Sequence, residues 1–280
     1  MQPSALDAAT LEKLISAAVA APSMHHTQPP WHCRLDPDTV TLEVRAAPGR
    51  VPRHAERPDG MARTLNLTVG AAVFNLRVAM AHFGWRPVVQ LLPRPSEPEL
   101  LATVRPEPAP SGGDGHLDDL YEVIWRRHGD RLASSGRVSG RRLPQRVLSA
   151  LAEAAHTHGT TLYFPRDEET AQLLRINEEA ERRNARVLGR ATGNGSGPHG
   201  QERADAFAQR PTVAVLSTRH DHHADWLRAG QALQHVLLVA AAHTARAALL
   251  HQALEWPDLR WALSDDRRVT DHAQMLIRLG

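Results

Sequence analysis

Two glycine-led apolar segments, 160 residues apart, constrain the fold of this 280-residue chain more than any other feature. The segment GAAVFNLRVAMA begins at Gly70, and GQALQHVLLVAA begins at Gly230. Both segments place apolar residues at matching positions with helical spacing. A second pair of similar segments, LISAAVAA and VLSALAEAA, begins at Leu14 and Val147. The repeats predict two copies of one unit that pack as a pseudo-dimer, although alanine-rich helices also align by chance.

Hydrophobic periodicity and turn residues predict the same order of elements in both halves: an alanine-rich helix, a strand, the glycine-led helix and another strand. In the first half we expect helices over 11–21 and 68–83, and strands over 39–44 and 88–92. In the second half we expect helices over 117–125, 144–155, 168–187 and 224–250, and strands over 161–164, 212–217 and 275–279. A Pro/Gly-rich linker at 106–116 is expected to separate a first unit, 1–110, from a second unit, 117–280.

The composition excludes several classes of protein. Basic and acidic residues nearly balance, with 33 Lys and Arg against 31 Asp and Glu, which argues against a nucleic-acid-binding surface. The single cysteine, Cys33, forms neither an intrachain disulfide nor a cysteine-based zinc site, and we expect it to pack as a small hydrophobe. The longest apolar run, 236–242, is too short to span a bilayer, and the N-terminal residues lack a signal-peptide pattern. We therefore expect a cytoplasmic protein without a membrane partner.

Polar side chains gather in the segment 22–30, which is predicted to be a loop because prolines at 22, 29 and 30 forbid regular structure. This loop, within APSMHHTQPPW, presents Ser23, His26 and Gln28 close together in sequence. A proline-stiffened loop of this kind offers hydrogen-bonding groups for a planar heterocycle and for a polyol chain. An ordinary helix-to-strand connection is the alternative, since loops are usually polar.

A basic cluster, RRHGDR at 126–131, follows the predicted helix 117–125. Its arginines Arg127 and Arg131 are four residues apart, so both guanidinium groups can converge on one anionic group. The alternative is a solvated basic turn, because most arginines are exposed.

A second cluster, RHDHHAD at 219–225, contains three histidines and two aspartates. These residue types bind transition metals, and Asp-His-His also occurs in DHH phosphoesterases, whose further aspartate and glycine-rich motifs are not found here. We favour a surface loop in which Asp225 caps the N-terminus of the following helix, and we expect no metal site.

In combination, these segments resemble the nitroreductase superfamily, in its Acg-type branch of FMN-binding oxidoreductases. The loop is similar to the family's APSxHNxQPW segment, and the resemblance covers nearly the whole chain. The other similar blocks are GAAVFNLRVAMAHFGW, YEVIWRRHGDR, RPTVAVLSTRHDHHADWLRAGQALQHVLL, HQALEWPDLRWAL and QMLIRLG. The resemblance implies an α+β, nitroreductase-like fold with two degenerate halves arranged as a fused pseudo-dimer. Ordinary members of the family are homodimers with FMN at the subunit interface.

The resemblance also implies one FMN site between the halves and no catalytic side chain, because the flavin carries the chemistry. RRHGDR is similar to the family's Arg-x-Ser-x-Arg/Lys motif, which implies Arg127 at the FMN phosphate and Arg131 at the pyrimidine edge. Gly129 stands where the family has a hydroxyl residue, and His26 stands where it has Asn. The residues expected at the cofactor are Arg127, Gly129, Arg131, Ser23, His26, Gln28, Gln252 and Glu255.

The implied activity is transfer of two electrons from NAD(P)H through FMN to a nitro compound, a quinone or a similar acceptor. The expected partners are therefore NAD(P)H and a small-molecule acceptor, and the expected state is a monomer or a homodimer. The alternative is a flavin-free or flavin-sequestering protein of the same fold without catalytic activity. Gly129, His26 and a sequence that ends at Gly280, before the family's Pro/Arg-rich tail, motivate this alternative.

Overall fold

The computed structural model describes residues 6–22, 29–47, 58–109, 115–133, 142–192, 212–264 and 271–280. Its helices are α1 (Ala8–Val19), α2 (Pro58–His82), α3 (Gly115–Asp118), α4 (Tyr121–Ala133), α5 (Gln145–His156), α6 (Asp167–Thr192), α8 (His223–Ala242), the 3-10 helix η2 (Gln252–Glu255) and α9 (Pro257–Ser264). Its strands are β1 (Trp31–Asp36), β2 (Thr41–Ala46), β3 (Trp85–Leu91), β4 (Leu100–Pro108), β5 (Thr161–Tyr163), β6 (Thr212–Thr218), β7 (Ala247–Leu250) and β8 (His272–Leu279). The predicted mixture of helices and sheets is confirmed.

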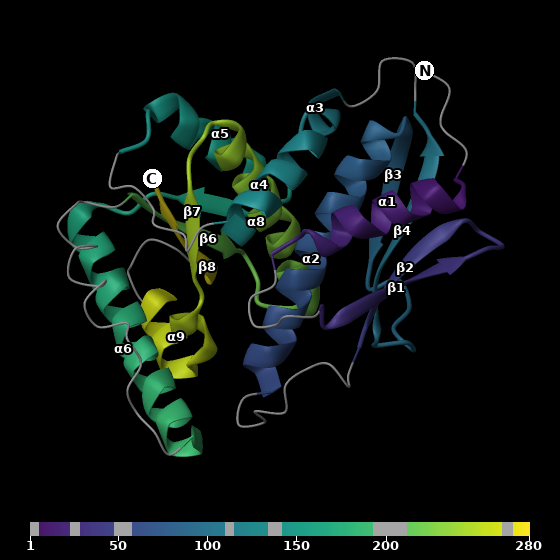
Figure 1. Cartoon of the computed structure of the whole chain (residues 1–280). Coiled ribbons are helices and arrows are strands. Elements are labelled where there is room, and N and C mark those ends of the chain that lie inside the picture. The colour runs from purple at the N-terminus through teal and green to yellow at the C-terminus, as the bar shows by residue number, and fades with distance from the viewer. Residues whose placement is uncertain are drawn as a thin grey trace.

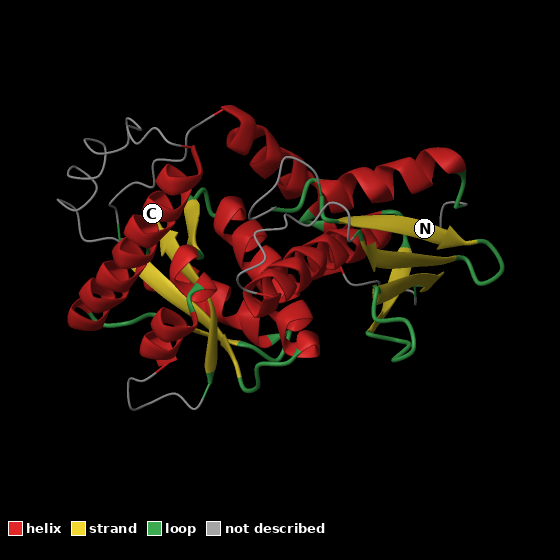
Figure 2. Ribbon diagram, turned by 90° about the horizontal axis from the view of Figure 1, so that it is seen from below, coloured by secondary structure: helices red, strands yellow, loops and turns green. Residues whose placement is uncertain are grey.

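The strands form two four-stranded antiparallel sheets with the same order. The first sheet has the order β1-β2-β4-β3, and the second has the order β5-β6-β8-β7. In Figure 1 the two sheets lie on opposite sides of the central helices α2 and α8, and Figure 2 shows the same separation from below. Along the chain, α2 lies between β2 and β3, and α8 lies between β6 and β7. These strands hold the second and fourth places across their sheets, so both halves share one topology.

The central helices α2 and α8 cross where the two repeated glycines meet. A Cβ atom on Gly70 would collide with the carbonyl oxygen of Leu227, and a Cβ atom on Gly230 would collide with that of Leu67. Either Cβ would also lie 2.9 Å from the other glycine's Cα. Leu67 and Leu227 are themselves 160 residues apart, so the same backbone contact is made in both directions. The close approach requires glycine at both positions, because any side chain would separate the helices.

One turn further along the crossing, the two reciprocal contacts differ. Gln234 Nε2 donates to Asn75 Oδ1 at 2.7 Å. At the pair related by the 160-residue repeat, the ring of Phe74 stacks on His235 with a centroid distance of 4.7 Å. The crossing therefore has matching backbone geometry and non-matching side chains on its two sides.

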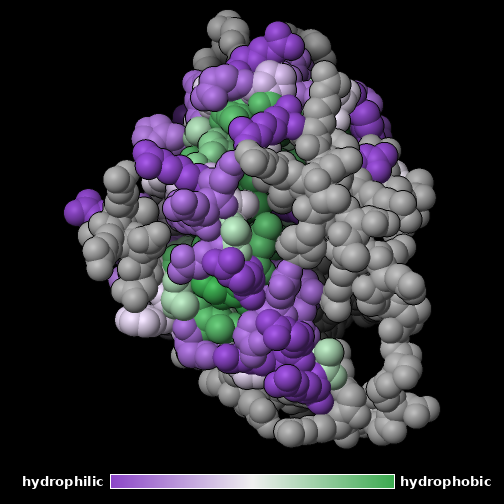
Figure 3. Space-filling model, turned by 90° about the vertical axis from the view of Figure 1, so that its left-hand side faces the viewer, coloured by the Kyte–Doolittle hydropathy of each residue, from purple (hydrophilic) through white to green (hydrophobic). Residues whose placement is uncertain are grey.

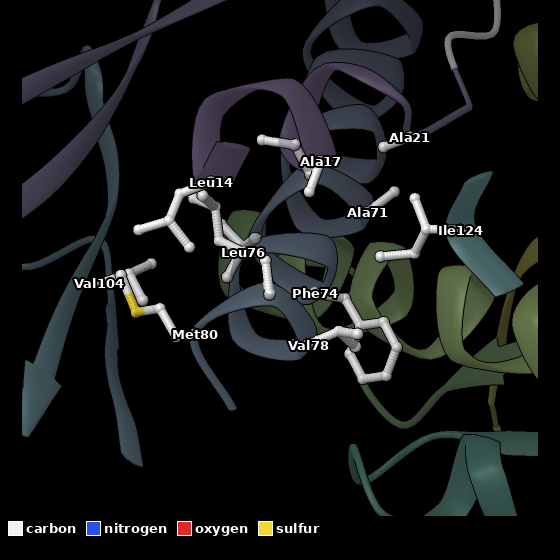
Figure 4. Close-up of a cluster of buried hydrophobic side chains, with 14 of the residues drawn as sticks. Leu14, Ala17, Ala21, Ala71, Phe74, Leu76, Val78, Met80, Val104 and Ile124 are labelled. Carbon is white, nitrogen blue, oxygen red and sulfur yellow. The ribbon is translucent and has the colours of Figure 1, made fainter. Parts of the chain in front are cut away.

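The first core lies between the first sheet, α1 and α2, and it extends to the helices α3 and α4. Figure 4 shows Leu14 and Ala17 of α1 beside Leu76 of α2, and Ile124 of α4 close to Ala71. The predicted small hydrophobe Cys33 packs against the same core, and burial raises the pKa of its thiol to about 12. Helices α3 and α4, which the sequence assigns to the second unit, thus pack on the core of the first.

The second core lies between α5, α8 and the second sheet, with a smaller cluster under α6, η2 and α9. Helix α6 buries Leu173, Asn177 and Ala180, which share one face of the helix. Figure 3, viewed from the side of the molecule on which α6 lies, shows mainly polar side chains with a band of apolar residues between them. The one described helix that is long and apolar enough to cross a membrane, Ala62–His82, has 83% of its most apolar window buried. It belongs to the core of the protein.

Several predicted boundaries were wrong. The basic cluster 126–131 lies inside α4 and not after its end, because arginine favours helices and one glycine costs only about 1 kcal/mol. Residues 247–250 form strand β7 and do not continue α8, because Thr244 adopts a left-handed conformation with φ 58° and ends the helix turn. Asp225 is not the N-cap of α8: the cap is His222, whose N–H donates to Asp225 Oδ2 at 3.2 Å.

The other differences concern lengths and missed strands. Strands β1 and β4 were not predicted, and residues 106–108 of the expected linker pair with β3 as the end of β4. Helix α2 begins at Pro58 instead of residue 68, and α6 runs to Thr192. Residues 110–114 of the expected linker lie outside the described residues.

Candidate functional site

Helix α4 brings the predicted phosphate-binding residues to the boundary between the halves. Its buried residues Val123 and Ile124 belong to the first core, and the helix packs against both α2 and α8. One turn further, Arg126 is exposed, whereas Arg127 and His128 are half-buried. The Nδ1 atom of His128 is buried and has no hydrogen-bond partner. This end of α4 therefore offers a guanidinium group and a ring nitrogen at the edge of the core.

Gly129 and Arg131 occupy the next turn of the same helix. Gly129 is exposed, and a Cβ atom added there would meet nothing within 4 Å. The backbone of Arg131 is helical and four residues after Arg127, which places both arginines on one face of α4. The side chain of Arg131 is not among those described. The convergence of the two guanidinium groups on one anionic group stays a prediction.

The predicted loop residues Ser23, His26 and Gln28 lie outside the described residues. The residues that precede them are described: Ala21 is buried and belongs to the same core cluster as Ile124. Figure 4 shows Ala21 on the same side of α2 as Ala71 and Ile124. Ala21 and Ile124 of α4 thus share the first core, immediately before the predicted loop.

Gln252 and Glu255 lie in the 3-10 helix η2, which follows strand β7. Gln252 is half-buried, and its Oε1 atom is buried without a hydrogen-bond partner. Glu255 Oε1 lies 3.5 Å from His251 Nε2. The turn packs against α2, α6 and α9. An amide oxygen without a partner is an available acceptor for a ligand N–H group.

The two groups of predicted residues meet α2 at different points. Arg63 of α2 contacts η2, whereas Ala71 of the same helix lies near Ile124 of α4. At 1.5 Å per residue these two positions of α2 are about 12 Å apart along its axis. The structure thus packs both α4 and η2 against one helix, α2.

The residue that joins α2 to η2, Arg63, was not among the predicted site residues. The Arg63 side chain is only 1% exposed, and it donates from Nη2 to the Leu254 carbonyl at 3.0 Å and from Nη1 to the Gln274 carbonyl at 2.9 Å. Burial, reinforced by Arg260, lowers the pKa of Arg63 to about 10, against the opposing effect of Asp221 and Glu255. The available signal was a lone arginine near the start of a long apolar helix.

Asp221 of the histidine-rich segment belongs to this buried network. Its carboxylate accepts from Trp226 Nε1 at 2.6 Å and Gln274 Nε2 at 2.9 Å, and it lies 3.2 Å from Arg260 Nη2. Burial acts to raise the pKa of Asp221, but the two hydrogen bonds and the Arg260 charge outweigh it and hold the pKa below its usual value. Among the described side chains, no group of three or more His, Cys, Asp or Glu is arranged to hold a metal ion.

Comparison with known proteins gives several relatives from Mycobacterium tuberculosis, while no family model matches the chain. The chain is 30% identical to the protein named "Putative NAD(P)H nitroreductase Rv3131", over 98% of this chain and 86% of the relative. It is 25% identical to "Uncharacterized protein Rv3127", over 96% of this chain and 86% of the relative. It is 31% identical to "Putative NAD(P)H nitroreductase acg", over 44% of this chain and 35% of that relative.

A relative that matches over nearly the whole chain, together with the mixed helix-and-sheet fold, defines the class of this protein: it belongs to the nitroreductase superfamily of oxidoreductases. Within that superfamily it is of the Acg type, to which the sequence motifs also assigned it.

Proposed function

We propose that the chain is an FMN-dependent oxidoreductase that passes two electrons from NAD(P)H to a nitro compound, a quinone or a similar small acceptor. The observation that carries this proposal is the position of Arg127 on α4, a helix that packs against both central helices, α2 and α8. Nitroreductase relatives that carry NAD(P)H in their names support the same activity. We further propose a cytoplasmic location, with NAD(P)H and the acceptor as partners.

We also propose that the units 1–110 and 117–280 are the halves of a fused pseudo-dimer, with the cofactor between them. The equal strand order of the two sheets and the reciprocal contact between Gly70 and Gly230 support this arrangement. Helix α4 supports it as well, because it comes from the second unit and packs on the core of the first. A ligand held by Arg127 therefore contacts both units.

The residues that are described fit a flavin mononucleotide. Arg127 supplies a fork of N–H donors for a phosphate group, which guanidinium binds in a bidentate manner. Gln252 Oε1, buried without a partner, is an acceptor for the N–H group of the flavin ring. Bound FMN supplies the hydride chemistry, and the chain holds, orients and shields it. Gln252 then fixes the ring at η2 while Arg127 and Arg131 hold the charged end and the pyrimidine edge.

The second candidate is a protein of the same fold that does not use flavin catalytically. One observation favours it: residue 129 of α4 is a glycine and has no hydroxyl group that could donate to a phosphate. A lost hydrogen bond to a charged group costs about 1.5–3 kcal/mol, or about one to two decades of affinity. The two candidates differ in whether the purified chain retains FMN.

The deciding experiment is the visible absorbance spectrum of the purified full chain, followed by release of cofactor on heating. We expect a yellow protein that releases FMN, and an Arg127→Ala variant with at least about tenfold weaker FMN binding. Arg126→Ala is the matched control, because it removes the neighbouring exposed arginine and should keep the wild-type affinity.

Unchanged FMN binding in Arg127→Ala would overturn the phosphate assignment. A colourless wild-type chain that stays colourless with added FMN would overturn the oxidoreductase proposal and support the second candidate. Steady-state assays with NADPH and a nitroaromatic compound then test the activity of a yellow protein.

A further inference from the structure

Arg63 is a buried cation whose direct partners are uncharged. Its two terminal nitrogens donate to the main-chain carbonyls of Leu254 and Gln274, and its Nε atom has no hydrogen-bond partner. Two carboxylates, those of Asp221 and Glu255, act on Arg63 through their charge without a hydrogen bond to it. The carboxylate of Asp221 is engaged by Arg260, by Trp226 and by the side chain of Gln274. The Arg63 charge is therefore not neutralised by a contacting carboxylate in the described structure.

Burial of a charge without a contacting counter-charge is unfavourable. A side chain that only fixed the backbone of η2 would not need to be charged. Removal of a cation from water costs several kcal/mol unless paired charges compensate it. A neutral donor such as glutamine would bond a carbonyl with less desolvation. The pKa of Arg63, although lowered by burial, stays near 10, so the guanidinium is charged at neutral pH. The retained charge indicates an electrostatic role.

The contacts of Arg63 place this charge at a functional turn. Leu254 lies between Gln252 and Glu255 in η2, so the guanidinium holds the backbone of the turn that carries both predicted cofactor residues. The second carbonyl, that of Gln274 in β8, fixes the guanidinium against the second sheet. A residue of the first unit thus sets the position of a turn in the second unit.

We propose that Arg63 is a positioning residue of the cofactor site: it holds η2 against the ring of the bound flavin and favours the negative charge that the ring gains on reduction. This inference rests on the proposed function. Its role is separate from the roles proposed for Arg127 and Arg131, because Arg63 donates directly to the backbone of η2 whereas those two arginines lie on α4. Arg63 acts through η2 and through its field, without contacting the acceptor.

The experiment compares the full-length wild-type chain with Arg63→Met, which keeps the length of the side chain and removes its charge and donors. Arg63→Lys keeps the charge, and Val104→Ala, a buried residue of β4 in the first core, controls for lost stability without contact to η2. Each variant is measured by amide hydrogen exchange without FMN, by FMN titration for Kd, and by the reduction potential of bound FMN.

In Arg63→Met we expect faster exchange in the peptide 251–256, FMN binding weaker by about tenfold, and a more negative reduction potential. Arg63→Lys should restore the potential even if the exchange is only partly restored, because a lysine at this position still carries the charge. Val104→Ala should change neither the exchange of 251–256 nor the potential. This pattern separates an electrostatic positioning role from general destabilisation.

Wild-type exchange of 251–256 in Arg63→Met would overturn the positioning role, whatever the flavin measurements show. An unchanged potential and Kd in Arg63→Met, with a wild-type chain that binds FMN, would overturn the cofactor role. Absence of FMN binding by the wild-type chain would instead overturn the proposed function and the cofactor role together, and the exchange measurement would still decide whether Arg63 holds η2.

Discussion

Gly129 is the residue at which a small change should strengthen cofactor binding. The space around it is open, so a serine hydroxyl fits without displacing neighbours. We predict that Gly129→Ser binds FMN about tenfold more tightly than the wild type, because it adds one hydrogen bond to a charged group. Gly129→Ala is the matched control: both variants should stabilise α4 by about 0.5–1 kcal/mol, since glycine is a poor helix former.

Thermal unfolding and FMN titration of the two variants test this prediction. A serine variant with the same FMN Kd as the alanine variant would show that the phosphate does not lie beside this turn of α4. If both variants were more stable than the wild type but had the same FMN Kd, the substitutions would act only through helix propensity.

His158 makes the stability of the fold depend on pH. Its Nε2 lies 3.3 Å from His235 Nδ1, at the end of α5 beside α8, with the ring of Phe74 in edge contact. Burial first, and then the charges of Arg77 and His235, lower the pKa of His158 to about 3. Below its unfolded pKa of about 6.5, the unfolded chain binds a proton that the folded chain does not. The stability contributed at neutral pH is therefore lost progressively as the pH falls from about 6.5 towards 3.

The variant His158→Gln isolates this contribution. We predict that the wild-type chain loses about 2–3 kcal/mol more than His158→Gln between pH 7 and pH 4.5. Urea unfolding at the two pH values measures the difference, because acid effects on carboxylates such as Asp221 are common to both proteins. Equal losses in both proteins would contradict the assignment of this pH dependence to His158.

At the scale of elements, the crossing of α2 and α8 should be the part of the fold least tolerant of added volume. A Cβ atom on Gly70 meets backbone atoms of α8, which cannot move aside as a side chain tip does. We predict that Gly70→Ala and Gly230→Ala each lower the free energy of unfolding by at least about 1–3 kcal/mol. Gly129→Ala is again the control, since its new methyl group meets nothing. If urea unfolding showed that each variant lowers the free energy of unfolding by less than about 0.5 kcal/mol, the close approach of α2 and α8 would be contradicted.

The elements that sequence analysis predicted are those whose pattern is local. The periodicity of α5 and the apolar run of β6 predicted both elements to within a residue or two. Strand β7, with the sequence AALL, was missed because alanine and leucine favour helices and only its pairing with β8 makes it a strand. The extension of α4 was missed for the opposite reason, since a basic run with a glycine is typical of a turn but is compatible with a helix.

At the scale of the whole molecule, the sequence could point only to candidate site residues that lie within one short segment. Arg127 and Gln252 each lie in a short motif, and the elements that carry them, α4 and η2, both pack against α2. The partners of Arg63, Gln274 and Leu254, are 211 and 191 residues away in sequence, so no local pattern connects them. The repeat was visible in the sequence, but the difference between its two sides depends on single residues such as Asn75 and His235.

The difference between the two sides of the α2–α8 crossing extends to the C-terminal ends of the alanine-rich helices α1 and α5. Asn75 Nδ2 donates directly to the Ala17 carbonyl of α1 at 2.7 Å. At the repeat-related position, His235 Nδ1 lies 3.4 Å from Thr157 Oγ1, which donates to the Ala154 carbonyl of α5 at 2.8 Å. The helix ends are thus held by equivalent but different contacts, and only the α1 end leads into the loop 23–28. The two sides of the crossing are therefore not interchangeable as ligand sites.

One cofactor per chain follows from this asymmetry if the proposed function holds. Only one side of the crossing combines the loop after α1 with the arginines of α4, because the first unit has no arginine motif of this kind and the second has no such loop. The reciprocal contact between α2 and α8 is made within one chain, as the proposed pseudo-dimer requires. We therefore predict a monomer of 30.8 kDa that binds one FMN. Light scattering with quantitative flavin release measures both quantities, and two FMN molecules per chain, or one per two chains, would contradict the single asymmetric site.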